Sequence, residues 1–246
     1  MSPGDDAACR VCGAGTGAPF AHKDGYQFAR CGHCGFVYLD RMPSSEALAA
    51  LYDGGTGGGI TAESYPKAAS RLRRSGVRAL RFWRHLHGRD ALDIGCGGGF
   101  MVEAMGWLGA RAVGVDINSQ AIAYATQQFP RRRFIAADFD DFADHGLTFD
   151  FVHASEVMEH VPDIGRYMTV LAAITRPGGR VFITTPDIGH RRVPDDVTEW
   201  DMFSPPTHVQ FFDAATIATL FERHGFRLRH RYFKLKPGLQ ILAERL

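Results

Sequence analysis

The sequence predicts an α/β fold, a doubly wound seven-stranded sheet preceded by a small cysteine-rich unit. Three observations support this prediction. Strand-like and helical segments alternate from residue 90 onward, which is the pattern of a parallel sheet covered on both faces. The first predicted strand of that region, 91–95, runs into a cluster of glycines before a helix. Four of the five cysteines form two C-x-x-C pairs near the amino end.

Length and composition limit the kind of protein that this chain can be. It has 246 residues, of which 45% are hydrophobic and 22% charged, enough to bury one large domain with a small appendage. The formal net charge of +1 provides no overall field that would steer nucleic acid or an anionic membrane. The polar, acidic amino end is unlike a signal or transit peptide, and no apolar run reaches about 18 residues. We therefore expect a cytoplasmic protein without a membrane partner.

Two cysteine knuckles at the amino end predict a metal site. Cys9 and Cys12 form the first pair, and Cys31 and Cys34 form the second. Four thiolates on two tight turns suit tetrahedral Zn²⁺, and a closed four-cysteine shell leaves no open position for chemistry. We predict a structural zinc ribbon over residues 1–40, with a hairpin between the knuckles. A redox dithiol pair or an iron site is the alternative, and a histidine in the second knuckle could replace one cysteine as a ligand.

A linker or lid is predicted over residues 41–66, because a short capped helix is followed there by a glycine-rich stretch. The main domain follows over residues 67–246. One amphipathic helix is predicted from 67 to 87, with an apolar stripe of Leu72, Gly76, Ala79, Leu80, Trp83 and Leu86. Its arginines are predicted to lie largely off that stripe, as a solvated basic face: Arg71, Arg73, Arg74, Arg78, Arg81 and Arg84. Alternatively, these arginines could bind RNA or a sugar diphosphate.

The remaining elements follow in order along the chain. Strands are predicted at 91–95, 111–116, 133–138, 149–156 and 179–187. Helices are predicted at 100–108, 119–129 and 162–175 between these strands. After a helix over 213–224, two strands at 226–234 and 238–245 are joined by a Lys-Pro-Gly turn short enough for a hairpin.

The glycine loop predicts a site for a nucleotide-like ligand. Gly95, Gly97 and Gly99 let the backbone turn tightly and approach a ligand where a Cβ atom would collide, and the next helix presents free N–H groups. Phe100 stands where a dinucleotide fingerprint has glycine or alanine. The Asp93 carboxylate, at the ligand end of the strand, would repel a phosphate but suits a ligand with an ammonium and a sulfonium group. S-adenosylmethionine is such a ligand.

Acids end the second and third predicted strands, in the segments Gly-Val-Asp116-Ile117-Asn and Ala-Ala-Asp138-Phe139. Together with the glycine loop, they resemble the class I S-adenosylmethionine-dependent methyltransferases over residues 90–246. The resemblance implies five parallel strands plus a C-terminal antiparallel hairpin. It also implies that Asp116 accepts hydrogen bonds from both ribose hydroxyls, that Asp138 meets the adenine amino group, and that Ile117 and Phe139 sandwich the ring. Each acid alone could instead cap the helix that follows it.

The resemblance therefore implies a set of cofactor-binding residues along the carboxyl ends of the first four strands. The set is Asp93, Gly95, Cys96, Gly97, Gly99, Asp116, Ile117, Asp138, Phe139 and Ser155.

A second motif, Glu156-Val-Met-Glu159-His160, is followed farther along by His208. It resembles the ubiquinone-pathway O-methyltransferases and the plant small-RNA 2′-O-methyltransferase, in which E-x-x-E-H and a distant histidine hold a divalent metal beside the acceptor hydroxyl. Residues i, i+3 and i+4 of a helical turn converge on one side, and two carboxylates so close repel each other unless a proton or cation lies between them. Such a set accepts Mg²⁺, Mn²⁺, Fe²⁺ or Zn²⁺.

Two alternatives to this metal site stay open. The glutamates could simply favour the start of the next helix, or His160 could be a metal-free base oriented by Glu159, as a resemblance to sugar methyltransferases with N-terminal zinc domains implies. His208 could belong to a packing motif with the two phenylalanines that follow it. His190, Trp200 and Phe203 share its connection and are expected to line the acceptor site.

Taken together, these features predict an S-adenosylmethionine-dependent methyltransferase acting on a hydroxyl of a small molecule, a sugar or a phenolic natural product. The expected catalytic residues are His160, Glu159 and His208. Carbon methylation of a nucleotide-linked sugar is the second hypothesis, and an RNA methyltransferase that uses the ribbon and the basic helix is the third. A non-catalytic scaffold with the same fold is the fourth. A nucleic-acid partner is not expected, and the sequence indicates no oligomeric state.

Overall fold

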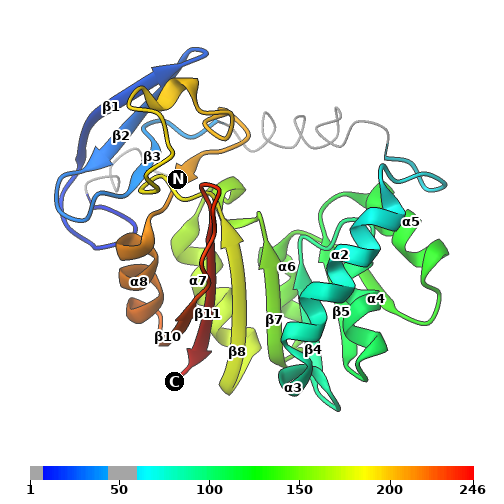
Figure 1. Ribbon diagram of the computed structural model, residues 1–246. Helices are drawn as coiled ribbons and strands as arrows, with labels where there is room; N and C mark the ends of the chain where they lie inside the picture. Colours follow the sequence, from blue (N-terminus) through cyan, green and yellow to red (C-terminus); the bar gives the residue numbers. More distant parts are fainter. Residues whose placement is uncertain (1–7, 44–59) are drawn as a thin grey trace.

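A computed structural model describes residues 8–43 and 60–246 (Figure 1). Its larger sheet has the strand order β10-β11-β8-β7-β4-β5-β6. The strands are β4 (Asp90–Ile94), β5 (Arg111–Asp116), β6 (Arg133–Ala136), β7 (Phe149–Ser155), β8 (Thr175–Thr185), β10 (Phe226–Arg231) and β11 (Leu239–Arg245). β4 to β8 pair in parallel, whereas β11 is antiparallel to both β8 and β10. The predicted seven-stranded α/β fold with its antiparallel C-terminal hairpin is confirmed.

Helices cover both faces of this sheet. They are α2 (Ala68–Arg81), α3 (Trp83–Leu86), α4 (Phe100–Trp107), α5 (Ser119–Gln128), α6 (Phe139–Phe142), α7 (Ile164–Ile174) and α8 (Ala214–Arg223). Because successive side chains of a strand point to opposite faces, Phe151 and Val152 belong to different hydrophobic clusters. Phe151 shares its cluster with residues of α2 and α4, and Val152 shares its cluster with residues of α7 and α8. Among the described residues, no helix has the length and apolar character needed to cross a membrane.

A second, smaller sheet has the order β1-β2-β3-β9. It consists of β1 (Gly17–Lys23), β2 (Tyr26–Cys31), β3 (Val37–Leu39) and β9 (Gln210–Phe211). β1 and β2 form the hairpin predicted between the cysteine knuckles. β9 was not predicted as a strand, and it comes from the long connection after β8. In Figure 1 the blue amino-terminal strands and the yellow to orange connection lie together at the upper left.

The predicted helix over 67–87 is wrong in its continuity, and its predicted apolar stripe is buried only in part, at Ala79 and Leu86. It breaks at Phe82 into α2 and α3, and the buried Phe82 ring packs against Phe151 and Phe182, with ring centroids at 5.3 and 4.7 Å. Leu80 and Trp83, predicted in the buried stripe, are 60% and 50% exposed. The predicted helix near 43–52 lies almost wholly outside the described residues.

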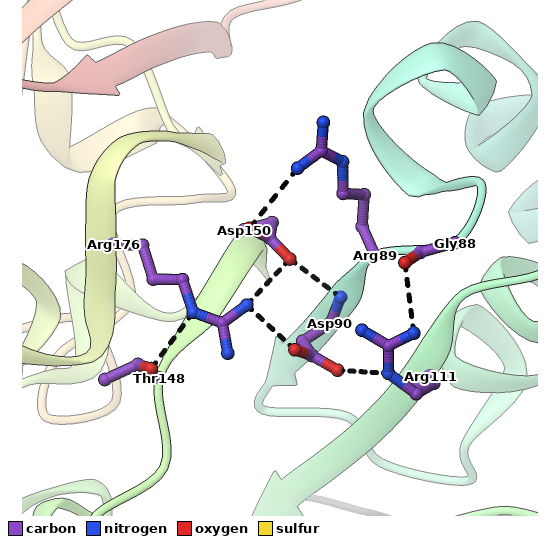
Figure 2. Close-up of polar contacts among 7 residues, drawn as sticks. All are labelled: Gly88, Arg89, Asp90, Arg111, Thr148, Asp150 and Arg176. Atoms are coloured by element: carbon purple, nitrogen blue, oxygen red, sulfur yellow. Dashed lines mark hydrogen bonds and ion pairs between the residues drawn. The ribbon is translucent and has the colours of Figure 1, made fainter.

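The amino ends of the large-sheet strands are tied together by ion pairs (Figure 2). Arg176 donates from one nitrogen to both Asp90 and Asp150, at 2.8 Å each, and Arg111 pairs with Asp90 at 2.6 Å. Arg176 lies in β8, which begins at Thr175 and not at the predicted residue 179. Partly exposed ion pairs contribute little stability each, so the network mainly fixes the strand ends opposite the glycine loop.

Candidate active site

The glycine loop has a backbone conformation that suits close approach to a ligand, and Tyr65 packs over it. Gly97 and Gly99 have positive φ values of 51° and 77°, which glycine adopts without strain. Gly99 caps α4 without a side-chain hydrogen bond, so the first N–H groups of the helix stay available. A Cβ atom on Gly97 would lie 2.7 Å from the hydroxyl oxygen of Tyr65, whose ring packs on Phe100. Tyr65 thus covers the loop, a contact that no sequence periodicity indicated.

Asp116 is positioned to accept hydrogen bonds from a ligand. It ends β5, and its two carboxylate oxygens accept from the backbone N–H groups of Gly97 at 2.7 Å and Asn118 at 2.9 Å. Each oxygen keeps a further lone pair. Burial raises the pKa of Asp116, and the two backbone hydrogen bonds lower it in part. Ile117, the next residue, leaves its apolar side chain 51% exposed. This pairing of acceptor and exposed apolar surface fits a ribose and an adenine ring.

The other predicted cofactor-binding residues differ in their exposure to solvent. Asp138 is exposed after β6, whereas Phe139 packs its ring against Tyr167 with centroids at 4.9 Å and is partly committed to the core. Cys96 is buried, and burial raises the pKa of its thiol well above the ordinary value. It is therefore a neutral packing residue within the loop.

A buried hydrogen bond between an aspartate and a histidine lies beneath the loop. The Asp93 Oδ1 atom is 2.6 Å from His153 Nδ1, and both side chains are almost fully buried. On the other side of the ring, Arg78 approaches His153 Nε2 at 3.3 Å. Because a guanidinium group can only donate, Nε2 accepts and Nδ1 carries the proton donated to Asp93. A histidine inside the apolar strand sequence Phe-Asp-Phe-Val-His-Ala-Ser was the signal that could have indicated this pair.

Arg78 points into the site and not into solvent, contrary to the prediction for the basic face. It donates to Ser155 Oγ at 3.0 Å, and Ser155 Oγ is 2.7 Å from Thr184 Oγ1. Thr184 in turn donates to Glu156 Oε1 at 2.6 Å. Each hydroxyl both accepts and donates, so the hydrogen bonds run in one direction from Arg78 to the Glu156 carboxylate. This chain joins the cofactor side to the acceptor side.

Glu159, His160 and His208 come together at the carboxyl end of the sheet. One ligand atom from each residue lies within 4.8 Å of those of the other two. His160 Nδ1 donates to the carbonyl of Thr207 at 2.8 Å, and His208 Nδ1 donates to the carbonyl of Met202 at 2.6 Å. Both hydrogen bonds place the ring lone pair on Nε2, as in histidines that ligate metals.

The Glu159 carboxylate is fully buried and only half satisfied. Its Oε2 accepts from Thr185 Oγ1 at 2.9 Å, while Oε1 has no hydrogen-bond partner among the residues that the structure describes. Burial, and then the nearby Glu156 carboxylate, raise the pKa of Glu159 to about 8. Burial, and then His208, lower the pKa of His160 to about 4. An orphaned carboxylate oxygen beside two neutral imidazoles fits a divalent cation, which would supply the missing partner.

Glu156 lies at the edge of this group and does not belong to it. Its φ of 57° takes the chain out of a helical path, so the predicted convergence of i, i+3 and i+4 is wrong for the first residue. Its carboxylate still contributes to the raised pKa of Glu159. Asp163 caps α7 by accepting from the Arg166 N–H at 3.0 Å, so neither glutamate is needed as a helix cap.

Two of the residues expected to line the acceptor site belong to a hydrophobic cluster. Phe203 is fully buried, and its ring centroid lies 4.6 Å from that of Phe28 and 4.9 Å from that of Phe211. Trp200, 7% exposed, packs in the same cluster. The expectation is therefore wrong for both, because the connection folds onto the small sheet. His190 is half-buried and accepts from the backbone of Arg192.

The four knuckle cysteines gather as one group. The sulfur atoms of Cys9 and Cys34 are 3.7 Å apart, and so are those of Cys12 and Cys31. Sulfurs of a disulfide lie about 2.05 Å apart, whereas the edge of a tetrahedron with Zn–S bonds of about 2.3 Å is about 3.8 Å. The cysteine geometry therefore fits zinc and excludes disulfides.

Comparison with known proteins agrees with this geometry. A family model described as "Methyltransferase domain" matches residues 53–231, more than half of the chain. A ubiquinone biosynthesis O-methyltransferase of Burkholderia cenocepacia is 37% identical over 107 residues, 41% of this chain and 46% of that protein. One from Rhizobium etli is 38% identical over 107 residues, 42% of this chain and 43% of that protein. The chain thus matches less than half the length of these curated relatives.

Solved structures share the fold. An S-adenosylmethionine-dependent methyltransferase from Mesorhizobium loti has a TM-score of 0.58 at 21% identity, covering 70% of this chain and 98% of that one. Magnesium protoporphyrin IX methyltransferase from Synechocystis PCC 6803, with bound SAH, has a TM-score of 0.57 at 17% identity and covers 71% and 83%. At these identities the likeness concerns the fold alone.

Proposed function

Because the chain belongs to the methyltransferase domain family and is an S-adenosylmethionine-dependent methyltransferase, we propose that its acceptor is a hydroxyl group of a small phenolic or sugar molecule. The observation that carries the proposal is the group formed by Glu159, His160 and His208 at the carboxyl end of the sheet. The relatives named as ubiquinone biosynthesis O-methyltransferases favour a phenolic hydroxyl over a sugar hydroxyl.

The cofactor side of the site binds and orients. We assign the ribose to Asp116, held by two backbone N–H groups, and the adenine ring to the exposed Ile117 and the edge of Phe139. When bound, S-adenosylmethionine would supply an electrophilic methyl group, and these residues would hold that group toward the acceptor hydroxyl. The main task of these residues is to align the two reacting atoms.

On the acceptor side, Glu159 Oε1 and the Nε2 atoms of His160 and His208 would hold a divalent cation. Such an ion lowers the pKa of a hydroxyl that it binds and fixes its position. The metal-free alternative is weaker, because His160 Nε2 is 4.0 Å from Glu159 Oε1, too far for the orienting hydrogen bond. A histidine with a pKa of about 4 is also poorly matched to a phenol of ordinary pKa about 10.

The knuckle cysteines would hold one structural zinc ion. All four sulfurs lie within 4.8 Å of one another, and a closed shell of four thiolates would leave no place for a substrate ligand. We divide the chain into the ribbon, a linker over residues 41–66 and the catalytic domain that follows. The ribbon shares its sheet with β9, so it is attached to the catalytic domain along a strand.

The acceptor chemistry can be tested with ¹³C-methyl S-adenosylmethionine and two matched phenols. We expect a vicinal diphenol such as 3,4-dihydroxybenzoate to be methylated on oxygen in the presence of Mg²⁺, because two adjacent oxygens can chelate a cation. The ring with a single hydroxyl should react more slowly. NMR of the product distinguishes O-methyl from C-methyl carbon. Methylation of a nucleotide-linked sugar on carbon, with neither phenol reacting, would replace this proposal by its alternative.

Asp116→Ala is expected to weaken binding of S-adenosylhomocysteine by about 10- to 100-fold, because a partly buried ligand hydroxyl loses a charged acceptor. Calorimetry measures the affinity without turnover. Asp144→Ala, which removes an exposed carboxylate of the 3-10 turn Ala143–His145, should bind as the parent does. Parent-like affinity of the Asp116 variant would show that the ribose is held elsewhere.

A further inference from the structure

The last strand of the ribbon is hydrogen-bonded to the segment that carries His208. β3 pairs with β9 in antiparallel register, with Val37 opposite Phe211 and Tyr38 opposite Gln210. The N–H of Leu39 donates to the carbonyl of Val209 at 2.8 Å. A strand of the ribbon therefore lies directly against the residues that follow His208.

The same segment holds the turn that carries Glu159 and His160. The buried side-chain amide of Gln210 donates from Nε2 to the carbonyls of Met158 at 2.6 Å and Val161 at 2.9 Å, on either side of the two candidate ligands. The N–H of Val209 donates to the carbonyl of Glu159 at 2.9 Å. Three hydrogen bonds thus connect Val209 and Gln210 to this turn and to the residue that follows it.

The turn needs support from outside because its own backbone is weak. Met158–His160 is a single 3-10 turn, whose hydrogen bonds have poorer geometry than those of an α-helix. Glu156, just before it, has a left-handed φ of 57°, which costs free energy for any residue with a side chain. Local sequence preference alone does not hold such a conformation.

The ribbon braces β9 and the turn through side chains as well. Phe36, between the second knuckle and β3, packs on Phe212 with ring centroids at 5.2 Å. Arg10, in the first knuckle, donates to the carbonyl of Pro162 at 2.7 Å, just after the turn. The first knuckle and the residue that precedes β3 therefore contact segments next to the candidate cation ligands.

We propose that Gln210 is a positioning residue for methyl transfer and that the zinc ribbon acts on the reaction through it. β3 fixes β9, and the Gln210 amide then fixes the turn so that Glu159 and His160 face His208. This inference rests on the proposed function, in which those three residues hold a divalent cation. Supporting groups around metal ligands commonly change metal affinity or activity by about 10- to 100-fold.

The test is Gln210→Met, which keeps the length of the side chain and removes its two donors. We expect Mn²⁺ affinity, measured with the ion alone by electron paramagnetic resonance, to fall by about 10- to 100-fold, with a similar loss of turnover. Backbone amides over 157–163 should exchange faster with deuterium. The zinc content and the affinity for S-adenosylhomocysteine should stay at parent values, because neither site uses this amide.

Gln27→Met is the matched control. The Gln27 amide also donates to two backbone carbonyls, of Ala21 at 3.0 Å and Phe28 at 2.9 Å, but within the ribbon hairpin. This variant should keep parent Mn²⁺ affinity. If Gln210→Met does not fold, Gln210→Asn keeps the amide but shortens its reach, and it should show the same losses to a smaller degree.

Two negative results have different meanings. If the parent protein binds Mn²⁺ no more tightly than the Glu159→Gln variant does, the proposed cation site is wrong. The deuterium-exchange measurement then still decides whether Gln210 holds the turn. Parent-like exchange over 157–163 in the folded Gln210 variant overturns the inference, whether or not a cation binds.

Discussion

Replacing Glu159 with glutamine is expected to abolish divalent-cation binding at the acceptor site and to lower turnover by about 10²- to 10⁴-fold. Glu159 supplies the only carboxylate among the three converging ligand atoms. Glutamine has the same size and can still accept from Thr185. The change therefore removes the carboxylate that would carry a negative charge with the ion bound, and it does so with little loss of packing. Two neutral imidazoles alone retain a divalent ion poorly. Mn²⁺ titration and turnover with the diphenol measure the two effects.

Glu222→Gln is the control for this charge change, because Glu222 is exposed on α8. It should bind Mn²⁺ and turn over as the parent does. Both variants should bind S-adenosylhomocysteine normally. Chelation of the parent should reproduce the Glu159 result only while zinc analysis shows that the ribbon keeps its ion. Full turnover of Glu159→Gln would eliminate a catalytic cation at this group.

Most of the large sheet could be predicted because its signals are local. The glycine loop after an apolar strand placed β4 and α4, and the acid at the end of β5 placed the next strand. Pairing between strands that are far apart in the sequence was harder to predict. β9 has only two residues, and its Val-Gln-Phe-Phe context reads as a packing motif, so nothing in the sequence indicated that it would pair with β3.

The candidate site was predictable in residue type and less so in geometry. The motif and His208 indicated which side chains meet, but a positive φ at Glu156 moves this residue out of the group. Arg78 was assigned to a solvated face because it lies on the polar side of the helix. Helical periodicity does not indicate that its long side chain reaches the buried His153. Arg78 is therefore not available to bind RNA on the predicted basic face. RNA binding by the other arginines of α2 stays a prediction.

Replacing both Cys31 and Cys34 with serine is expected to have the second large effect, on stability and on turnover together. Without two of four thiolates the ribbon should lose its zinc. Cys31 and Phe36 share one hydrophobic cluster with Phe212 of the catalytic domain. Loss of the ion therefore loosens a shared core. We expect the free energy of unfolding to fall by roughly 3–5 kcal/mol and the melting temperature to fall by on the order of 10 °C.

Turnover should fall further than stability alone explains, since β3 supports β9 and Gln210 supports the turn with Glu159. Below the new melting temperature, the serine variant should still bind S-adenosylhomocysteine but should bind Mn²⁺ weakly. Cys96→Ser, which changes a buried thiol outside the knuckles, should keep one zinc per chain by elemental analysis. If the zinc-free variant retained both parent Mn²⁺ affinity and parent turnover, the ribbon would be an attachment without influence on the reaction.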